Sequence, residues 1–196
     1  MKTKYKVVLL TVCAVLLIAS AAFGTIAYLT DQETVTNTFT VGKVVITLDE
    51  TDVDTAGVKE SETRVKANEY HLIPGHEYTK DPTVHVANDS EDCYLFVKVE
   101  NEIAEIEAAD NTIAAQIAAN GWTALGGVDN VYYKEFNKTA GVYDFPVFAN
   151  FKIDGASVTN ENLAPYQDKT IVVTAYAIQQ DGFANAIAAW EAGNFN

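Results

Sequence analysis

The sequence predicts a mainly β protein: a jelly-roll-like β-sandwich with short helical insertions, preceded by an N-terminal signal helix. Short runs rich in β-branched and aromatic residues recur along the chain and are separated by turn-forming residues. Helical spacing of apolar residues is confined to two short stretches in the second half. A third observation is an uncharged run close to the first residue. With 196 residues and 48% hydrophobic composition, the chain is long enough to bury one full core.

Strand signals account for most of the chain after residue 37. The predicted strands are residues 38–48, 83–87, 93–100, 131–136, 142–153 and 170–178. Pro146 turns part of its run into an edge or a bend, because proline cannot donate to a strand ladder. The run 170–178 (TIVVTAYAI) is apolar on both alternations, which predicts a central strand covered on both faces. The polar stretch 49–68 predicts a surface loop, and Pro74-Gly75 predicts a turn.

Two helical insertions are expected. Apolar residues at helical spacing run from residue 103 to residue 119, with isoleucines on one face. Asp110-Asn111 breaks this run into a short turn and a second helix, which is capped there and ends at Gly121. An alanine-rich helix is predicted at 183–192.

The first residues predict a secretory signal peptide that ends at Ala27. Three lysines precede the uncharged run 7–23, and Thr25 and Ala27 supply the small-x-small site before Tyr28. The alternative is an uncleaved anchor, although a run of about 17 residues is at the lower limit for crossing a bilayer. We therefore expect a secreted protein, in contact with the membrane only before cleavage.

Charge and cysteine content restrict the partners and the means of stabilisation. The net charge is −14, and it becomes −17 when three lysines and no acid leave with the signal peptide. Such a surface repels nucleic acid and anionic membranes, so neither is an expected partner. Cys93 is then the single cysteine, and its strand pattern predicts a small buried apolar residue rather than a disulfide.

The sequence predicts no catalytic residue, no cofactor and no metal site. His76-Glu77 begins a zinc-protease-like pair, but Lys80 stands where the second histidine is needed. Convergence of the three histidines, His71, His76 and His85, on a metal remains an alternative to plain surface and loop positions. The acids between residues 49 and 54 fail the calcium-loop pattern, which favours a solvated acidic loop.

Three blocks of the sequence resemble the TasA/camelysin family of Gram-positive secreted proteins. The first block is a signal-peptide end and a strand start; it matches at Gly24-Thr25-Ile26-Ala27-Tyr28, Asp31, Gly42, Val44 and Ile46. The second spans residues 72–100 and matches at Leu72, Pro74, Gly75, Lys80, Asn88 and Ser90. The third spans residues 170–183 and resembles a late strand that ends in A-x-Q. Residues 101–165 add nothing to the resemblance.

The resemblance implies a jelly-roll domain released by a SipW-type signal peptidase. The TasA branch forms extracellular biofilm-matrix fibres, in which the freed N-terminal segment adds as a strand to the next subunit. The resemblance also allows an accessory matrix protein as a partner. The camelysin branch is described as a cell-surface metalloprotease, and this is the first alternative.

The stretch just after the expected cut has the position that such a donor strand requires. The candidate donor strand consists of Tyr28, Leu29, Thr30, Asp31, Gln32, Glu33, Thr34 and Val35. A strand added in trans supplies backbone hydrogen bonds, and a head-to-tail contact of this kind grows into a filament. The opposing interpretation is a disordered N-terminus or an edge strand that pairs with its own sheet.

These inferences give a division of the chain and a ranking of functions. Residues 1–27 are the expected signal peptide, residues 28–38 the N-terminal segment, and residues 39–196 one jelly-roll-like domain. The leading hypothesis is a non-enzymatic fibre subunit whose main partner is a second copy of itself. A camelysin-like protease comes second. A monomeric surface module that binds glycan through exposed aromatics comes third, with Trp122, Tyr132 and Tyr133 as its candidates.

Overall fold

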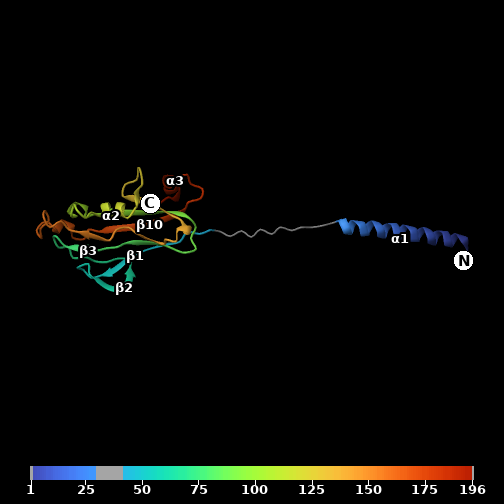
Figure 1. Cartoon of the computed structure of the whole chain (residues 1–196), viewed down its shortest axis with the longest axis horizontal. Coiled ribbons are helices and arrows are strands. Elements are labelled where there is room, and N and C mark those ends of the chain that lie inside the picture. The colour runs from blue at the N-terminus through green and yellow to red at the C-terminus, as the bar shows by residue number, and fades with distance from the viewer. Residues whose placement is uncertain (1, 30–41, 196) are drawn as a thin grey trace. The chain divides into compact units, whose positions relative to one another are not determined.

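The computed structural model describes residues 2–29 and 42–195, with side chains described for residues 2–17 and 42–195. The chain divides into two compact units, residues 1–40 and residues 41–196. The first unit contains the helix α1 (Thr3–Leu29), drawn in blue in Figure 1. Among the described residues, no helix combines the length and hydropathy needed to cross a membrane.

The backbone of the predicted cleavage site lies inside α1. Thr25, Ala27 and Tyr28 belong to this helix, which ends at Leu29. The rest of the candidate donor strand, residues 30–35, lies outside the described residues.

The second unit is mainly β, and every strand pair in it is antiparallel. One four-stranded sheet has the order β2-β1-β4-β8; its strands are β1 (Ile46–Val53), β2 (Lys59–Val65), β4 (Thr83–Val86) and β8 (Asp144–Pro146). The other has the order β10-β5-β7-β6; its strands are β5 (Cys93–Asn101), β6 (Thr123–Ala124), β7 (Val131–Phe136) and β10 (Ile171–Gln179). A two-stranded sheet joins β3 (Glu77–Thr79) to β9 (Asn150–Lys152).

Short helices connect and cover the strands. They are η1 (Ala104–Ile106), α2 (Ile113–Ala119), η2 (Lys138–Ala140), η3 (Ala164–Tyr166) and α3 (Ala186–Gly193). The predicted break in the first helical stretch is confirmed, but Thr112 rather than Asp110 or Asn111 caps α2, because its side chain accepts from the Ala115 amide. Gly121 follows this helix with a φ of 79°, a conformation that glycine adopts without strain.

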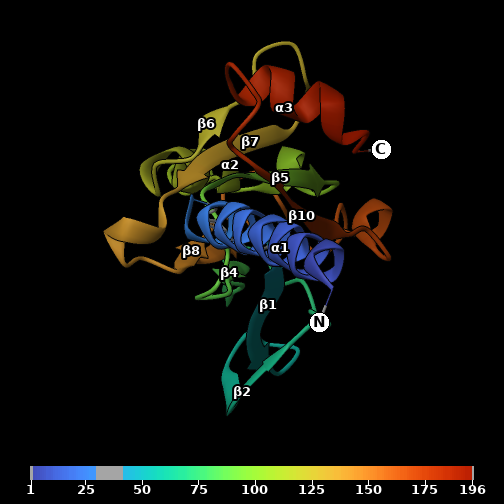
Figure 2. The same ribbon diagram turned by 90° about the vertical axis from the view of Figure 1, so that its right-hand side faces the viewer.

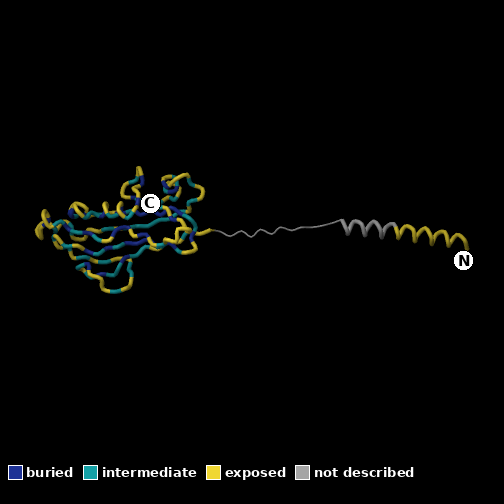
Figure 3. The backbone as a smooth tube through the Cα atoms, viewed as in Figure 1, coloured by how far each residue is buried: buried dark blue, intermediate teal, exposed yellow. Residues whose placement is uncertain are grey.

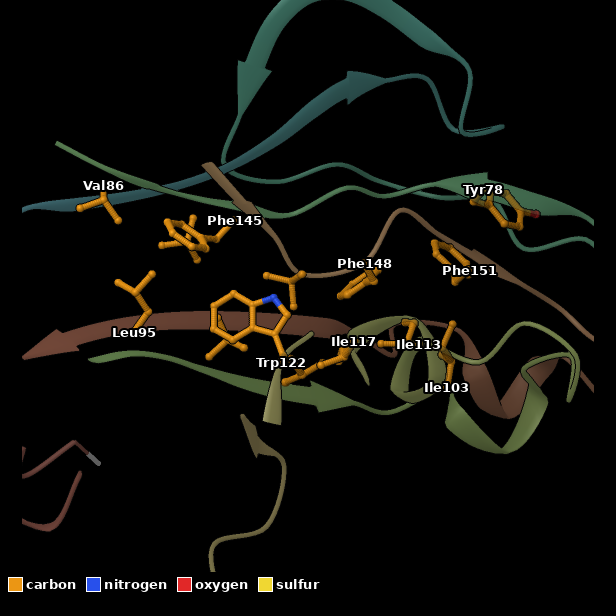
Figure 4. Close-up of a cluster of buried hydrophobic side chains, with 14 of the residues drawn as sticks. Tyr78, Val86, Leu95, Ile103, Ile113, Ile117, Trp122, Phe145, Phe148 and Phe151 are labelled. Carbon is orange, nitrogen blue, oxygen red and sulfur yellow. The ribbon is translucent and has the colours of Figure 1, made fainter. Parts of the chain in front are cut away.

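One large apolar core, called the main core below, lies between the two four-stranded sheets. It receives Val84 and Val86 from β4 and Leu95, Val97 and Val99 from β5. Figure 4 shows the rings of Trp122, Phe145 and Phe148 among the aliphatic side chains of this core. The buried strands contrast with the exposed turns in Figure 3.

A smaller apolar cluster, called the α3 cluster below, lies on the outer face of the sheet that contains β10. It joins Phe96 of β5 and Tyr176 of β10 to Trp190 of α3, with ring centroids 5.1 Å and 5.6 Å from the indole. Figure 2 shows α3 over this face, on the opposite side of the sheet from β4 and β1. Cys93, at the start of β5, is fully buried as predicted, and burial raises the pKa of its thiol to about 12.

Four expectations for strands were wrong. Of the predicted strand 38–48, residues 42–45 are not in a strand, because β1 begins at Ile46. The stretch 49–68 is not one loop, because it contains the second half of β1 and all of β2. The run 142–153 is two strands, β8 and β9, which belong to different sheets. Residues 170–178 do form a strand, but β10 lies at the edge of its sheet and not at the centre. Its two faces are both apolar because one meets the main core and the other meets the α3 cluster.

Candidate functional site

The edge of β10 offers an unprotected template for a further strand. All nine residues of β10 pair with β5, and no strand among the described residues pairs with its other edge. The strand IVVTAYAIQ contains no charged residue and no proline. Sheet edges are usually protected by charges, prolines, bulges or a covering segment, because exposed N–H and C=O groups pair readily with another chain.

The first half of β1 has a similar open side. Ile46 to Asp49 pair with β4, whereas the β2 ladder begins only at Glu50. Within residues 42–195, therefore, no strand pairs with the second edge of this half. Both open edges thus belong to sheets that enclose the same core.

A groove of about 1650 Å³ lies between β1 and β10. Its floor is apolar and includes Ile46, Leu48, Ile103, Phe151 and Val173. Phe151 and Ile103 are buried members of the main core, and the other three are half-buried side chains packed against it. The groove is therefore a place where the core meets solvent instead of being covered by a further strand.

A buried polar group lines the same groove beside this apolar floor. The Lys80 ammonium donates to Glu50 Oε2 at 2.6 Å, and the side chains of the two residues are 10% and 6% exposed. The side-chain amide of Asn68 donates to the other oxygen, Oε1, at 2.9 Å. Removing a charged pair from water is costly unless its geometry is good and its other hydrogen bonds are satisfied. The second hydrogen bond to Glu50 meets part of that requirement.

A second ionic group ties β1 to its neighbours. Arg64 of β2 donates to Asp49 and Asp81, and His85 of β4 contacts Asp49 through Nε2 at 2.9 Å and Asp144 through Nδ1 at 2.6 Å. Burial opposes the charge on His85, but the hydrogen bonds to Asp144 and Asp49 outweigh it and raise the histidine pKa. Burial also opposes the charge on Asp49, where hydrogen bonds from Arg64 and His85 outweigh it and lower the pKa.

The three histidines do not converge. His76 Nε2 contacts the Ala56 carbonyl at 2.9 Å, His85 lies between Asp49 and Asp144, and the His71 side chain is exposed. Across residues 2–29 and 42–195, no group of three or more His, Cys, Asp or Glu side chains is arranged to hold a metal ion.

Acidic side chains of the predicted solvated loop instead accept hydrogen bonds within the β1–β2 hairpin. Asp52 accepts from the Ser61 hydroxyl at 2.9 Å, and Asp54 accepts from the amides of Ala56 and Val58 at 3.0 Å and 2.8 Å. Each therefore helps to shape the β1–β2 hairpin.

The aromatics proposed for glycan binding are not a free surface. Trp122 is 3% exposed, and its indole N–H donates to the Pro146 carbonyl at 2.8 Å. Tyr132 and Tyr133 are half-buried and pack against the main core and the α3 cluster respectively. The expectation of exposed aromatic contacts was wrong for Trp122, because its ring is part of the core (Figure 4).

Sequence reasoning did not identify the groove. The useful signal is the run 170–178, which has no charge and no proline, but the same pattern also fits a central strand. Comparison of the chain with protein-family models, with curated proteins and with solved structures finds no match.

Proposed function

We propose that this protein is a secreted structural subunit of an extracellular biofilm-matrix fibre. In this proposal residues 28–35 of one copy, freed by signal-peptide cleavage, lie as a strand along β10 in the groove of the next copy. The observation that carries the proposal is the uncharged nine-residue edge of β10 beside a groove in which apolar side chains of the core are accessible.

Backbone pairing and side-chain seating together account for such a contact. An added strand satisfies the free N–H and C=O groups of an edge, and its alternate side chains occupy pockets that set the register. A strand rises roughly 3.3 Å per residue, so the eight residues 28–35 nearly match the length of β10. Leu29 and Val35 lie on one face of an extended segment, together with Asp31 and Glu33. We assign the two apolar side chains at the ends of this face to the apolar part of the groove.

The contact is head-to-tail because the segment and the groove are different surfaces. Contacts of this kind do not close on themselves unless the rotation allows a ring, so they generate filaments. Removal of residues 1–27 by a SipW-type signal peptidase is the step that frees Tyr28. The two four-stranded sheets around one core support the jelly-roll assignment that accompanies this proposal.

Electron microscopy of three forms of the purified protein tests the proposal. Residues 28–196 with a free Tyr28 should form filaments, whereas the same protein with an N-terminal tag and the protein lacking residues 28–36 should remain as particles. Circular dichroism on the deleted form controls for folding. Filaments from a folded protein that lacks residues 28–36 would overturn the assignment of the donor segment.

A synthetic peptide tests whether the groove is the surface that receives the segment. A peptide of residues 28–36 should bind the protein lacking residues 28–36, and it should perturb backbone amide signals of β10 in NMR spectra. A scrambled peptide of the same composition is the matched control. Perturbation confined to α3 or to the β1–β2 hairpin would contradict the assigned groove.

A further inference from the structure

Glu50, Asn68 and Lys80 have the arrangement of an acid-assisted amide transfer. One carboxylate lies between an amine and a primary amide: Glu50 Oε2 accepts from Lys80 Nζ at 2.6 Å, and Glu50 Oε1 accepts from Asn68 Nδ2 at 2.9 Å. The three residues come from β1, from the segment after β2 and from the residue after β3. We infer that Lys80 and Asn68 become joined by an intramolecular isopeptide bond, with Glu50 as the proton carrier.

The reaction balances without an oxidant, a reductant or a co-reactant. Glu50 takes a proton from Lys80 Nζ, and the neutral amine attacks Asn68 Cγ. The Nζ–Cγ bond forms, and Nζ then loses a second proton as the Cγ–Nδ2 bond breaks. Glu50 passes both protons in turn to the leaving nitrogen, which departs as ammonium. An amide replaces an ammonium group and an amide, so the neutral mass of the chain falls by one ammonia, and Glu50 is regenerated as the carboxylate.

Hydrogen bonds already polarise the Asn68 amide for this attack. Its carbonyl oxygen Oδ1 accepts from the Val53 amide at 3.1 Å, the position where negative charge develops during the addition. Its Nδ2 also donates to the Thr51 carbonyl at 2.8 Å. The register between β1 and β2 shifts between Thr51 and Val53, and this interruption of the ladder leaves these backbone groups available.

The three residues lie in poorly solvated surroundings. Lys80 and Glu50 are buried, and the Tyr70 ring centroid lies 5.9 Å from Nζ. Burial, together with the charge of Glu50, raises the pKa of the Tyr70 phenol. Transfer of a proton from Lys80 to Glu50 removes two opposite charges from this poorly solvated site, and so offsets part of the cost of burying them.

The bond would close the segment between Asn68 and Lys80 into a covalent loop. This segment contributes Asn68, Tyr70, Leu72 and Lys80 to the lining of the groove. A chain without a disulfide between its two cysteines would thereby gain a covalent constraint beside its open edge. The inference does not depend on fibre formation, because the reaction takes place within one copy.

Intact-mass spectrometry of the denatured full chain is the decisive experiment. We expect the mass calculated from the sequence less one ammonia, and tandem spectra of a digest that join the peptides containing Lys80 and Asn68. The full calculated mass for the folded protein would overturn the inference. A lower mass with no joined peptide would also overturn it, since cyclisation elsewhere in the chain gives the same loss.

Single substitutions test the role of each of the three residues in the inferred reaction. Glu50→Gln keeps the size and the hydrogen-bonding capacity of the side chain but cannot carry the proton, so it should restore the full mass in a soluble, folded protein. Lys80→Arg and Asn68→Ala should do the same. Lys66→Arg is the matched control, because Lys66 lines the same groove but donates to the Leu48 carbonyl, and this variant should keep the loss of ammonia. Loss of ammonia in Glu50→Gln at the wild-type level would exclude Glu50 as the proton carrier.

Discussion

Strands β5 and β10 are paired along their whole length, yet they differ sharply in burial. Both are nine residues long and rich in apolar residues. Most residues of β5 are buried, whereas β10 has no buried residue and is half-buried along most of its length. The difference arises because β5 lies between β10 and β7, while β10 has a single neighbour among the described strands. Position in the sheet, rather than composition, therefore separates a strand that stabilises the fold from one that is available for association.

The largest expected effect is on stability and belongs to β5. Leu95→Ala removes a fully buried side chain from the main core and should lower the free energy of unfolding by about 3 kcal/mol. Ile171→Ala on β10 removes a half-buried side chain and should cost about 1 kcal/mol. Urea unfolding of both variants, in a form lacking residues 28–36 so that assembly does not interfere, measures the difference. Equal losses would break the distinction between the two strands.

The second effect is on the proposed assembly, and it concerns the edge of β10. Val172→Lys places a charge on a side chain that is 43% exposed, and charges on edge strands oppose the addition of a further strand. We expect fibre growth roughly tenfold slower, equivalent to about 1.4 kcal/mol, with folding stability almost unchanged. Val142→Lys is the matched control, because Val142 is 53% exposed and does not line the groove. Equal slowing by both variants would point to net charge rather than to the β10 edge.

The smallest effect concerns the sheet that contains β1, in which His85 of β4 links β1 to β8. A histidine with a raised pKa stabilises the fold fully below its ordinary value of about 6.5, and this stabilisation is lost as the pH rises through the raised pKa. The lowered pKa of Asp49 acts in the opposite direction: its contribution is present above about pH 4 and is lost in acid. Stability should therefore be greatest in mild acid and decline as the pH rises above about 6.5.

Substitution of the histidine isolates this contribution. His85→Gln should remove the decline, which we expect to be no more than about 1 kcal/mol because the ring is partly exposed. His71→Gln, at an exposed histidine, should retain it. Denaturant unfolding between pH 5 and pH 8 provides the comparison, and an unchanged slope in His85→Gln would show that His85 is not the group responsible.

Local sequence patterns predicted those elements whose burial follows their own chemistry. Strands β4, β5 and β7 and helix α2 lie where alternation or helical spacing placed them. The patterns failed for β2 and for the second half of β1, because these strands are polar. Arg64 and Asp49, for example, have the character of loop residues but form an ion pair across the two strands. An apolar pattern cannot reveal a strand whose cross-strand contacts are ionic.

The sequence by itself therefore determined a mainly β protein, the chain positions of its buried strands, and a cysteine that packs as an apolar residue. These features depend on interactions between near neighbours along the chain, so they produce a recognisable spacing of apolar residues in the sequence. Only the tertiary structure decided that β10 is an edge, that a groove lies between it and β1, and that Lys80, Asn68 and Glu50 meet. The two contacts to Glu50 join residues 30 and 18 positions apart in the chain. Which distant segments become neighbours is decided by how the sheets pack around their shared core. The local spacing of apolar residues carries no information about that packing.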